Sequence, residues 1–102
     1  NVPAMRPNLT YLSLSGSTRE QVELEDDLRQ NSIRHLAVRH DGLVGFAMQR
    51  EGEPGSATPL LGLHRMGNAP LLAEAPIADE LAMQGYAGSV AFSGDGSEIA
   101  IT

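Results

Sequence analysis

Residues 36–42 read LAVRHDG, and residues 90–96 read VAFSGDG. The two stretches align residue for residue, and a second apolar alternation follows each Asp-Gly pair, with one extra residue in the later copy. An Asp-Gly pair between alternating apolar residues is a strong signal for a β-hairpin. Recurrence of such a unit is typical of blade-type β repeats, which bury their faces against one another. The repetition therefore predicts an all-β protein built from neighbouring modules.

Apolar alternation predicts further strands around the first copy. The whole chain, 1–102, is interpreted as a single fragment of a β-propeller-like architecture made of four-stranded antiparallel blades. It holds about two blades' worth of strands, in the order half, whole, half. The expected parts are a hairpin of one blade at 9–25, one whole blade at 33–74 and the first hairpin of the next blade at 89–102.

Two local features refine this expectation. The run 33–38 is nearly all apolar apart from Arg34 and His35, which predicts a strand buried on both faces. The stretch 76–84 is the most helix-like part of the chain, because Pro76 suits a first helical turn. At most one short helix is therefore expected.

Composition limits the classes of function. The chain is 41% hydrophobic and 20% charged, which indicates a folded domain rather than a disordered one. Its net charge of −6 argues against a nucleic-acid partner, whose binders carry basic surfaces. No apolar run is long enough for a membrane span, so no membrane insertion is expected. The absence of Cys removes disulfides and thiolate chemistry.

Two blades' worth of strands cannot close a ring, so open sheet edges are expected. Exposed edges pair with other strands. The expected partners are the remaining blades of a longer chain, or other copies of this chain associating through their sheet edges.

The candidate ligand-binding residues are Arg34, His35, His64 and Arg65, which form two Arg/His neighbours in strands that otherwise look buried. A buried imidazole or guanidinium needs a partner. The residues could together bind an anionic ligand, or they could serve the fold by bonding to backbone and carboxylates. Catalysis by them is the third alternative. No catalytic residue, metal site or cofactor is assigned, because the histidines match no compact metal-ligand spacing and no nucleophile motif is present.

Four segments taken in order, 5–12, 32–37, 59–65 and 85–91, resemble the bacterial family called domain of unknown function 1513. The resemblance covers essentially all of this chain and about the middle third of a typical member. It implies a seven-bladed propeller of a few hundred residues that is exported to the periplasm with a twin-arginine signal. It also implies a setting beside imelysin-like, iron-regulated proteins.

The resulting hypothesis is a periplasmic, propeller-like protein with a binding or scaffolding role and a link to iron uptake. One alternative is a propeller-type hydrolase or oxidoreductase that uses channel-side Arg and His residues. Another is a small stand-alone β domain that associates through open sheet edges.

Overall fold

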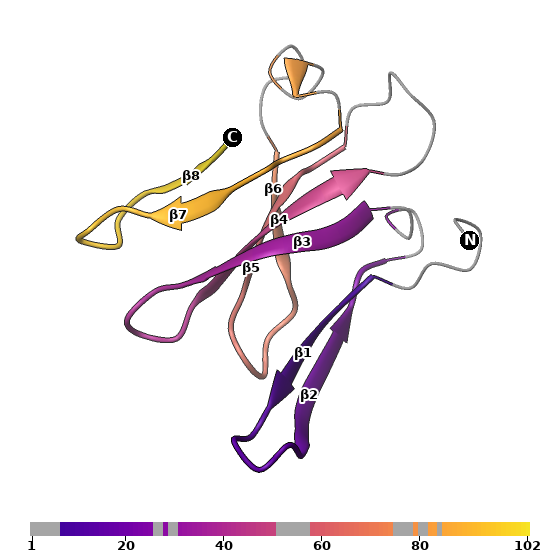
Figure 1. The fold of residues 1–102 in the computed structure, drawn as a ribbon, viewed down its shortest axis with the longest axis vertical. Helices are drawn as coiled ribbons and strands as arrows, with labels where there is room; N and C mark the ends of the chain where they lie inside the picture. The colour runs from indigo at the N-terminus through magenta and orange to yellow at the C-terminus, as the bar shows by residue number, and fades with distance from the viewer. Residues whose placement is uncertain are drawn as a thin grey trace.

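The computed structural model describes residues 7–25, 28, 31–50, 58–74, 79, 82–83 and 85–102. These residues form three antiparallel sheets, with a four-stranded sheet flanked by two hairpins (Figure 1). The strands are β1 (Asn8–Leu12), β2 (Thr18–Glu23), β3 (Asn31–Val38), β4 (Val44–Arg50), β5 (Leu61–His64), β6 (Leu71–Ala73), β7 (Val90–Phe92) and β8 (Ile99–Ile101). The hairpins are β1–β2 and β7–β8, and the central sheet has the order β3-β4-β5-β6.

This arrangement confirms the predicted fold class of antiparallel, blade-like sheets. The division of the chain into blades at 9–25, 33–74 and 89–102 stays a prediction, because it refers to neighbouring blades. Most of the predicted helix at 76–84 lies outside the described residues. Within that stretch the Met83 N–H donates a hydrogen bond to the Asp79 carbonyl at 3.2 Å.

The two copies of the repeat fold into the same type of turn. The Gly42 N–H donates to the Arg39 carbonyl, and the Gly96 N–H donates to the Ser93 carbonyl, both at 2.9 Å. Both glycines have positive φ, 93° and 77°, a conformation that residues with a Cβ rarely adopt. The one extra residue of the second copy lies in its turn. The hydrogen bond that closes the first turn runs from the Arg39 N–H to the Leu43 carbonyl, and the bond that closes the second turn runs from the Ser93 N–H to the Glu98 carbonyl, one residue further along.

Strand β4 forms the centre of the core. Val44, Phe46, Ala47 and Met48 are all buried, so both faces of this strand are covered. The prediction that 33–38 is buried on both faces is wrong, since Leu36 and Val38 are 55% and 66% exposed. The physical reason is position: β3 is an edge strand and β4 lies inside the sheet. An apolar run in the sequence does not show whether its strand lies at the edge or in the interior of the sheet.

The flanking hairpins cover opposite faces of the central sheet. Cross-strand partners share a face, and the register aligns Leu36 with Phe46, and Phe46 with Gly62. Hairpin β1–β2 covers this first face through Leu9, which belongs to the core cluster that contains Phe46. On the second face, the Gly45 Cα is approached by the side chains of Ile99 and Phe92, so β7–β8 lies there.

Neither hairpin covers its face completely. On the first face, Leu36 and Val38 are left exposed at the β3 side of the sheet. On the second face, β7 contacts β3 and β4, and Leu71 on β6 is 64% exposed. On the first face, therefore, the β3 side is exposed while hairpin β1–β2 covers the rest. On the second face, hairpin β7–β8 covers the β3–β4 side and the β6 side is exposed.

Gly62 provides a direct test of this packing. A Cβ at this position would overlap the ring of Phe46, which is 1% exposed and lies opposite Gly62 in the register. We expect Gly62→Ala to lower the free energy of unfolding by about 1–3 kcal/mol, as overpacked cores do. Thermal and urea unfolding measure the change.

Gly94→Ala is the matched control, because nothing lies within 4 Å of a Cβ built there. It should leave stability nearly unchanged. Equal losses for the two variants would contradict the packing of Phe46 against Gly62.

Candidate functional site

His64 lies between the β1–β2 hairpin and the central sheet. Its side chain is fully buried, and its two ring nitrogens have partners on different elements. The Tyr11 hydroxyl lies 2.6 Å from Nδ1, and the Asn68 carbonyl lies 2.7 Å from Nε2. A carbonyl only accepts hydrogen bonds, so Nε2 carries a proton, and in the neutral imidazole Nδ1 then accepts from the Tyr11 hydroxyl. The neutral imidazole satisfies both bonds.

Glu20 on β2 completes this contact. Its Oε2 lies 3.4 Å from His64 Nε2, and its Oε1 accepts a hydrogen bond of 2.7 Å from the Gly67 N–H. Burial, together with the nearby Glu20 charge, raises the pKa of Tyr11 above its ordinary value. The side chains of β1 and β2 therefore hold His64 and the β5–β6 turn, and no ring nitrogen of His64 is left for a ligand.

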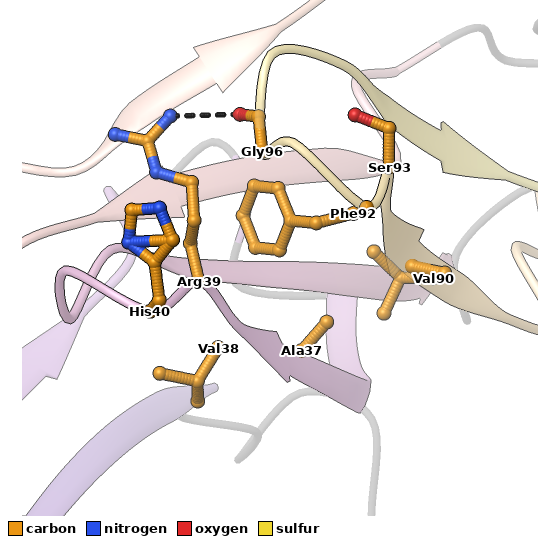
Figure 2. Close-up of a pocket in the computed structure, with 10 residues that line it drawn as sticks. Ala37, Val38, Arg39, His40, Val90, Phe92, Ser93 and Gly96 are labelled. Atoms are coloured by element: carbon orange, nitrogen blue, oxygen red, sulfur yellow. Dashed lines mark hydrogen bonds between the residues drawn. The ribbon is translucent and has the colours of Figure 1, made fainter.

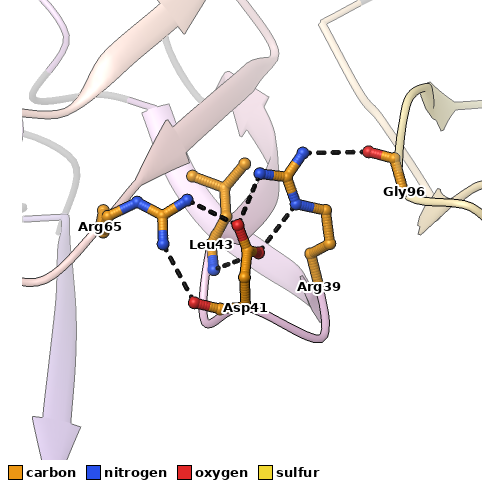
Figure 3. Close-up of polar contacts among 5 residues, drawn as sticks. All are labelled: Arg39, Asp41, Leu43, Arg65 and Gly96. Carbon is orange, nitrogen blue, oxygen red and sulfur yellow. Dashed lines mark hydrogen bonds and ion pairs between the residues drawn. The ribbon is translucent and has the colours of Figure 1, made fainter.

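Arg65 belongs to a second network, at the tips of the hairpins (Figure 3). Its guanidinium donates to the Asp41 backbone carbonyl and to Asp41 Oδ2, both at 3.0 Å. Arg39 donates to the two carboxylate oxygens of Asp41, each at 2.8 Å, and to the Gly96 carbonyl at 3.0 Å. The network thus links the β3–β4 turn to Arg65 after β5 and to the β7–β8 turn.

The electrostatics of the network keep Asp41 ionised. The hydrogen bonds from Arg39 and then Arg65 hold the pKa of the Asp41 carboxyl well below its ordinary value. Arg39 also lies over the Phe92 ring, 6.0 Å from its centroid. A Cβ at Gly96 would come within 2.7 Å of Arg39 Cδ, so the glycine makes room for this side chain.

The other two predicted site residues lie elsewhere. Arg34 is exposed at an irregularity of β3, between the paired residues Ile33 and His35. The His35 ring lies 6.5 Å from the Tyr86 ring. His35 pairs with Ala47, whereas His64 pairs with Val44, so the two histidines are separated along β4. The four residues do not converge on one site.

A groove lies between the two repeated segments, with a volume of about 370 Å³. Figure 2 shows Arg39 and His40 from the first copy opposite Phe92 and Val90 from the second. Ala37, Val38, Ala91, Ser93, Gly94 and Gly96 complete the lining. Sequence reasoning treated Arg39 and His40 as turn residues and missed them. The sequence feature that could have pointed to Arg39 is its difference from the second copy, which has Ser93 at the same position of the repeat.

Within the described ranges, no three His, Asp or Glu side chains lie close enough together to hold a metal ion. No helix among the described residues is long and apolar enough to cross a bilayer.

Comparison with known proteins identifies one family. The family model described as "Protein of unknown function (DUF1513)" matches residues 1–102. Searches of curated proteins and of solved structures each found no match.

The Tyr11–His64 hydrogen bond predicts a specific loss of stability. Tyr11→Phe removes the hydroxyl and leaves buried Nδ1 without a donor, which costs about 1–3 kcal/mol. Urea unfolding measures the effect. Tyr86→Phe is the matched control, because this tyrosine is 45% exposed, and it should change stability by less than about 0.5 kcal/mol. Similar effects of both substitutions would show that the bond contributes little.

Proposed function

The chain belongs to this family, and from that premise we propose that it forms part of a propeller-like ring whose role is binding or scaffolding. The observation that carries the proposal is the half-covered state of each face of the central sheet. Leu36 and Val38 are exposed on one face, and Leu71 is exposed on the other.

The repeat explains why these halves are exposed. Hairpin β7–β8 repeats β3–β4 in sequence and turn geometry, and it covers the β3–β4 half of the second face. A preceding hairpin of the same kind would cover Leu36 and Val38 on the first face. A following hairpin that packs as β1–β2 does would cover Leu71. Stacking of successive blades supplies both, as in a propeller.

The free edge of β8 supports the same arrangement. In the central sheet β5 pairs with β4, which is the equivalent of β8 in the repeat. Within the described residues, β8 has only β7 as a partner. A third strand on this edge would extend β7–β8 towards a blade like the central one. The strand would come from the remaining blades of a longer chain or from another copy.

Binding is favoured over catalysis by the placement of the titratable residues. The enzyme alternative needs Arg34, His35, His64 and Arg65 to act together. Both ring nitrogens of His64 are already hydrogen-bonded, and the guanidinium of Arg65 bonds Asp41. A scaffold that presents hairpin tips around a channel needs no such convergence.

The exposed apolar halves predict self-association of the 102-residue chain in solution. We expect a solution mass above that of the monomer, since exposed edges and apolar faces pair with other copies. Leu36→Lys and Leu71→Lys should each shift the mass towards the monomer, because a lysine ammonium is costly to bury. Light scattering coupled to size-exclusion chromatography measures the mass.

Leu14→Lys is the matched control, because Leu14 is fully exposed at the β1–β2 turn and lies on neither face of the central sheet. It should leave the association unchanged. A wild-type chain that is a compact, stable monomer would contradict the proposal.

Family resemblance extends the proposal to export through the twin-arginine route, a periplasmic location and a link to iron uptake. We expect the natural protein to appear in the periplasmic fraction of its host and its level to respond to iron. Fractionation with immunodetection measures both. Retention in the cytosol would contradict the export, and equal levels with and without iron would contradict the link to iron.

A further inference from the structure

We propose that the groove between the two repeated segments binds a small organic carboxylate, with its anionic group at Arg39 and its apolar part against Ala37 and Val90. This inference rests on the proposed binding role and names the ligand class. It places the ligand at Arg39 rather than at the four Arg and His residues singled out from the sequence.

The size and lining of the groove suit a small amphipathic ligand. Its volume of about 370 Å³ is within the range of small-molecule sites, roughly 300–1,000 Å³. Ala37 from the first copy, and Val90 and Phe92 from the second, supply apolar surface on the two sides of the groove.

Arg39 provides a preorganised anion donor at the rim of this surface. It donates three hydrogen bonds within the protein, two to Asp41 and one to Gly96. A guanidinium has five N–H donors, so part of its capacity is left over. The side chain is 28% exposed and is held in place by its contacts. Binding an anion would therefore cost little side-chain entropy.

The neighbouring carboxylates of Asp41 and Asp95 do not compete with a ligand for the remaining N–H donors of Arg39. Asp41 is shared by Arg39 and Arg65, so two cations face one anion. On the opposite hairpin, Asp95 accepts hydrogen bonds from the Ser97 N–H and from the hydroxyls of Ser93 and Ser97. These bonds lower the pKa of Asp95 to about 2. The exposed imidazole of His40 adds another donor at the rim.

Backbone groups add a second source of donors. Strand β3 pairs only with β4, and β7 pairs only with β8, within the residues that the structure describes. The edges of β3 and β7 therefore carry peptide N–H and C=O groups without a strand partner. Because Ala37, Val38, Val90 and Ala91 line the groove, a carboxylate there lies within the same region as these peptides.

The test compares hexanoate with its neutral analogue hexanamide by NMR titration of the ¹⁵N-labelled chain. We expect hexanoate to cause saturable amide shifts at 37–40 and 90–96. Hexanamide should bind at least about tenfold more weakly, since only the carboxylate adds a negative charge of its own to the hydrogen bonds with the Arg39 guanidinium. Gly94→Glu should weaken hexanoate binding by about tenfold or more, because Gly94 lines the groove with open space beside it and a like charge there faces the anion.

This variant keeps the Arg39–Asp41–Gly96 contacts, so a loss of binding does not come from disruption of the turn. Leu14→Glu adds the same charge outside the groove and should leave the hexanoate affinity unchanged. Absence of saturable shifts, equal affinity for both probes, or equal losses in both variants would overturn the proposal. The solution mass of the same samples is measured separately. A chain that self-associates but does not bind hexanoate would overturn the ligand proposal alone, without contradicting the proposed propeller-like ring.

Discussion

Burial of β4 on both faces is the constraint on which the rest of the structure depends. Phe46 projects onto the face that carries Gly62, and the absence of a side chain at Gly62 makes room for its ring. Gly45 plays the matching role on the other face, where Ile99 and Phe92 approach its Cα. The central sheet is thus shaped to receive a hairpin on each side. Burying a side chain such as Phe46 stabilises the fold by about 1.5–3 kcal/mol.

The two hairpins are attached to the central sheet by different chemistry. Hairpin β1–β2 is attached near β5 through Tyr11, Glu20 and buried His64, where each ring nitrogen is satisfied. Hairpin β7–β8 is attached near the tip of β3–β4 through Arg39, which bonds the Gly96 carbonyl and lies over Phe92. The first attachment is buried and closed, whereas the second is partly exposed and borders a groove. This difference is why ligand binding is assigned to the second.

The same position of the repeat makes different contacts in the two copies. At the start of the turn, Arg39 reaches from the first copy into the second. Its counterpart Ser93 bonds within its own turn, to Asp95 and the Glu98 N–H. The aspartates differ in the same way, because Asp41 is held by guanidiniums and Asp95 by hydroxyls and a peptide N–H. The turn is shared, and the contacts between neighbouring modules are specific to each copy.

The sequence by itself determined the antiparallel strands and the Asp-Gly turns, because alternation and turn residues act over a few residues of chain. Only the tertiary structure decided which strand is interior, which apolar residues are exposed and which charges meet. The stretch 33–38 and β4 are both rich in apolar residues, yet position in the sheet separates exposed Leu36 from buried Phe46. Likewise, Arg39 and Gly96 are distant in the chain, and only the packing of one hairpin against another brings the guanidinium to that carbonyl.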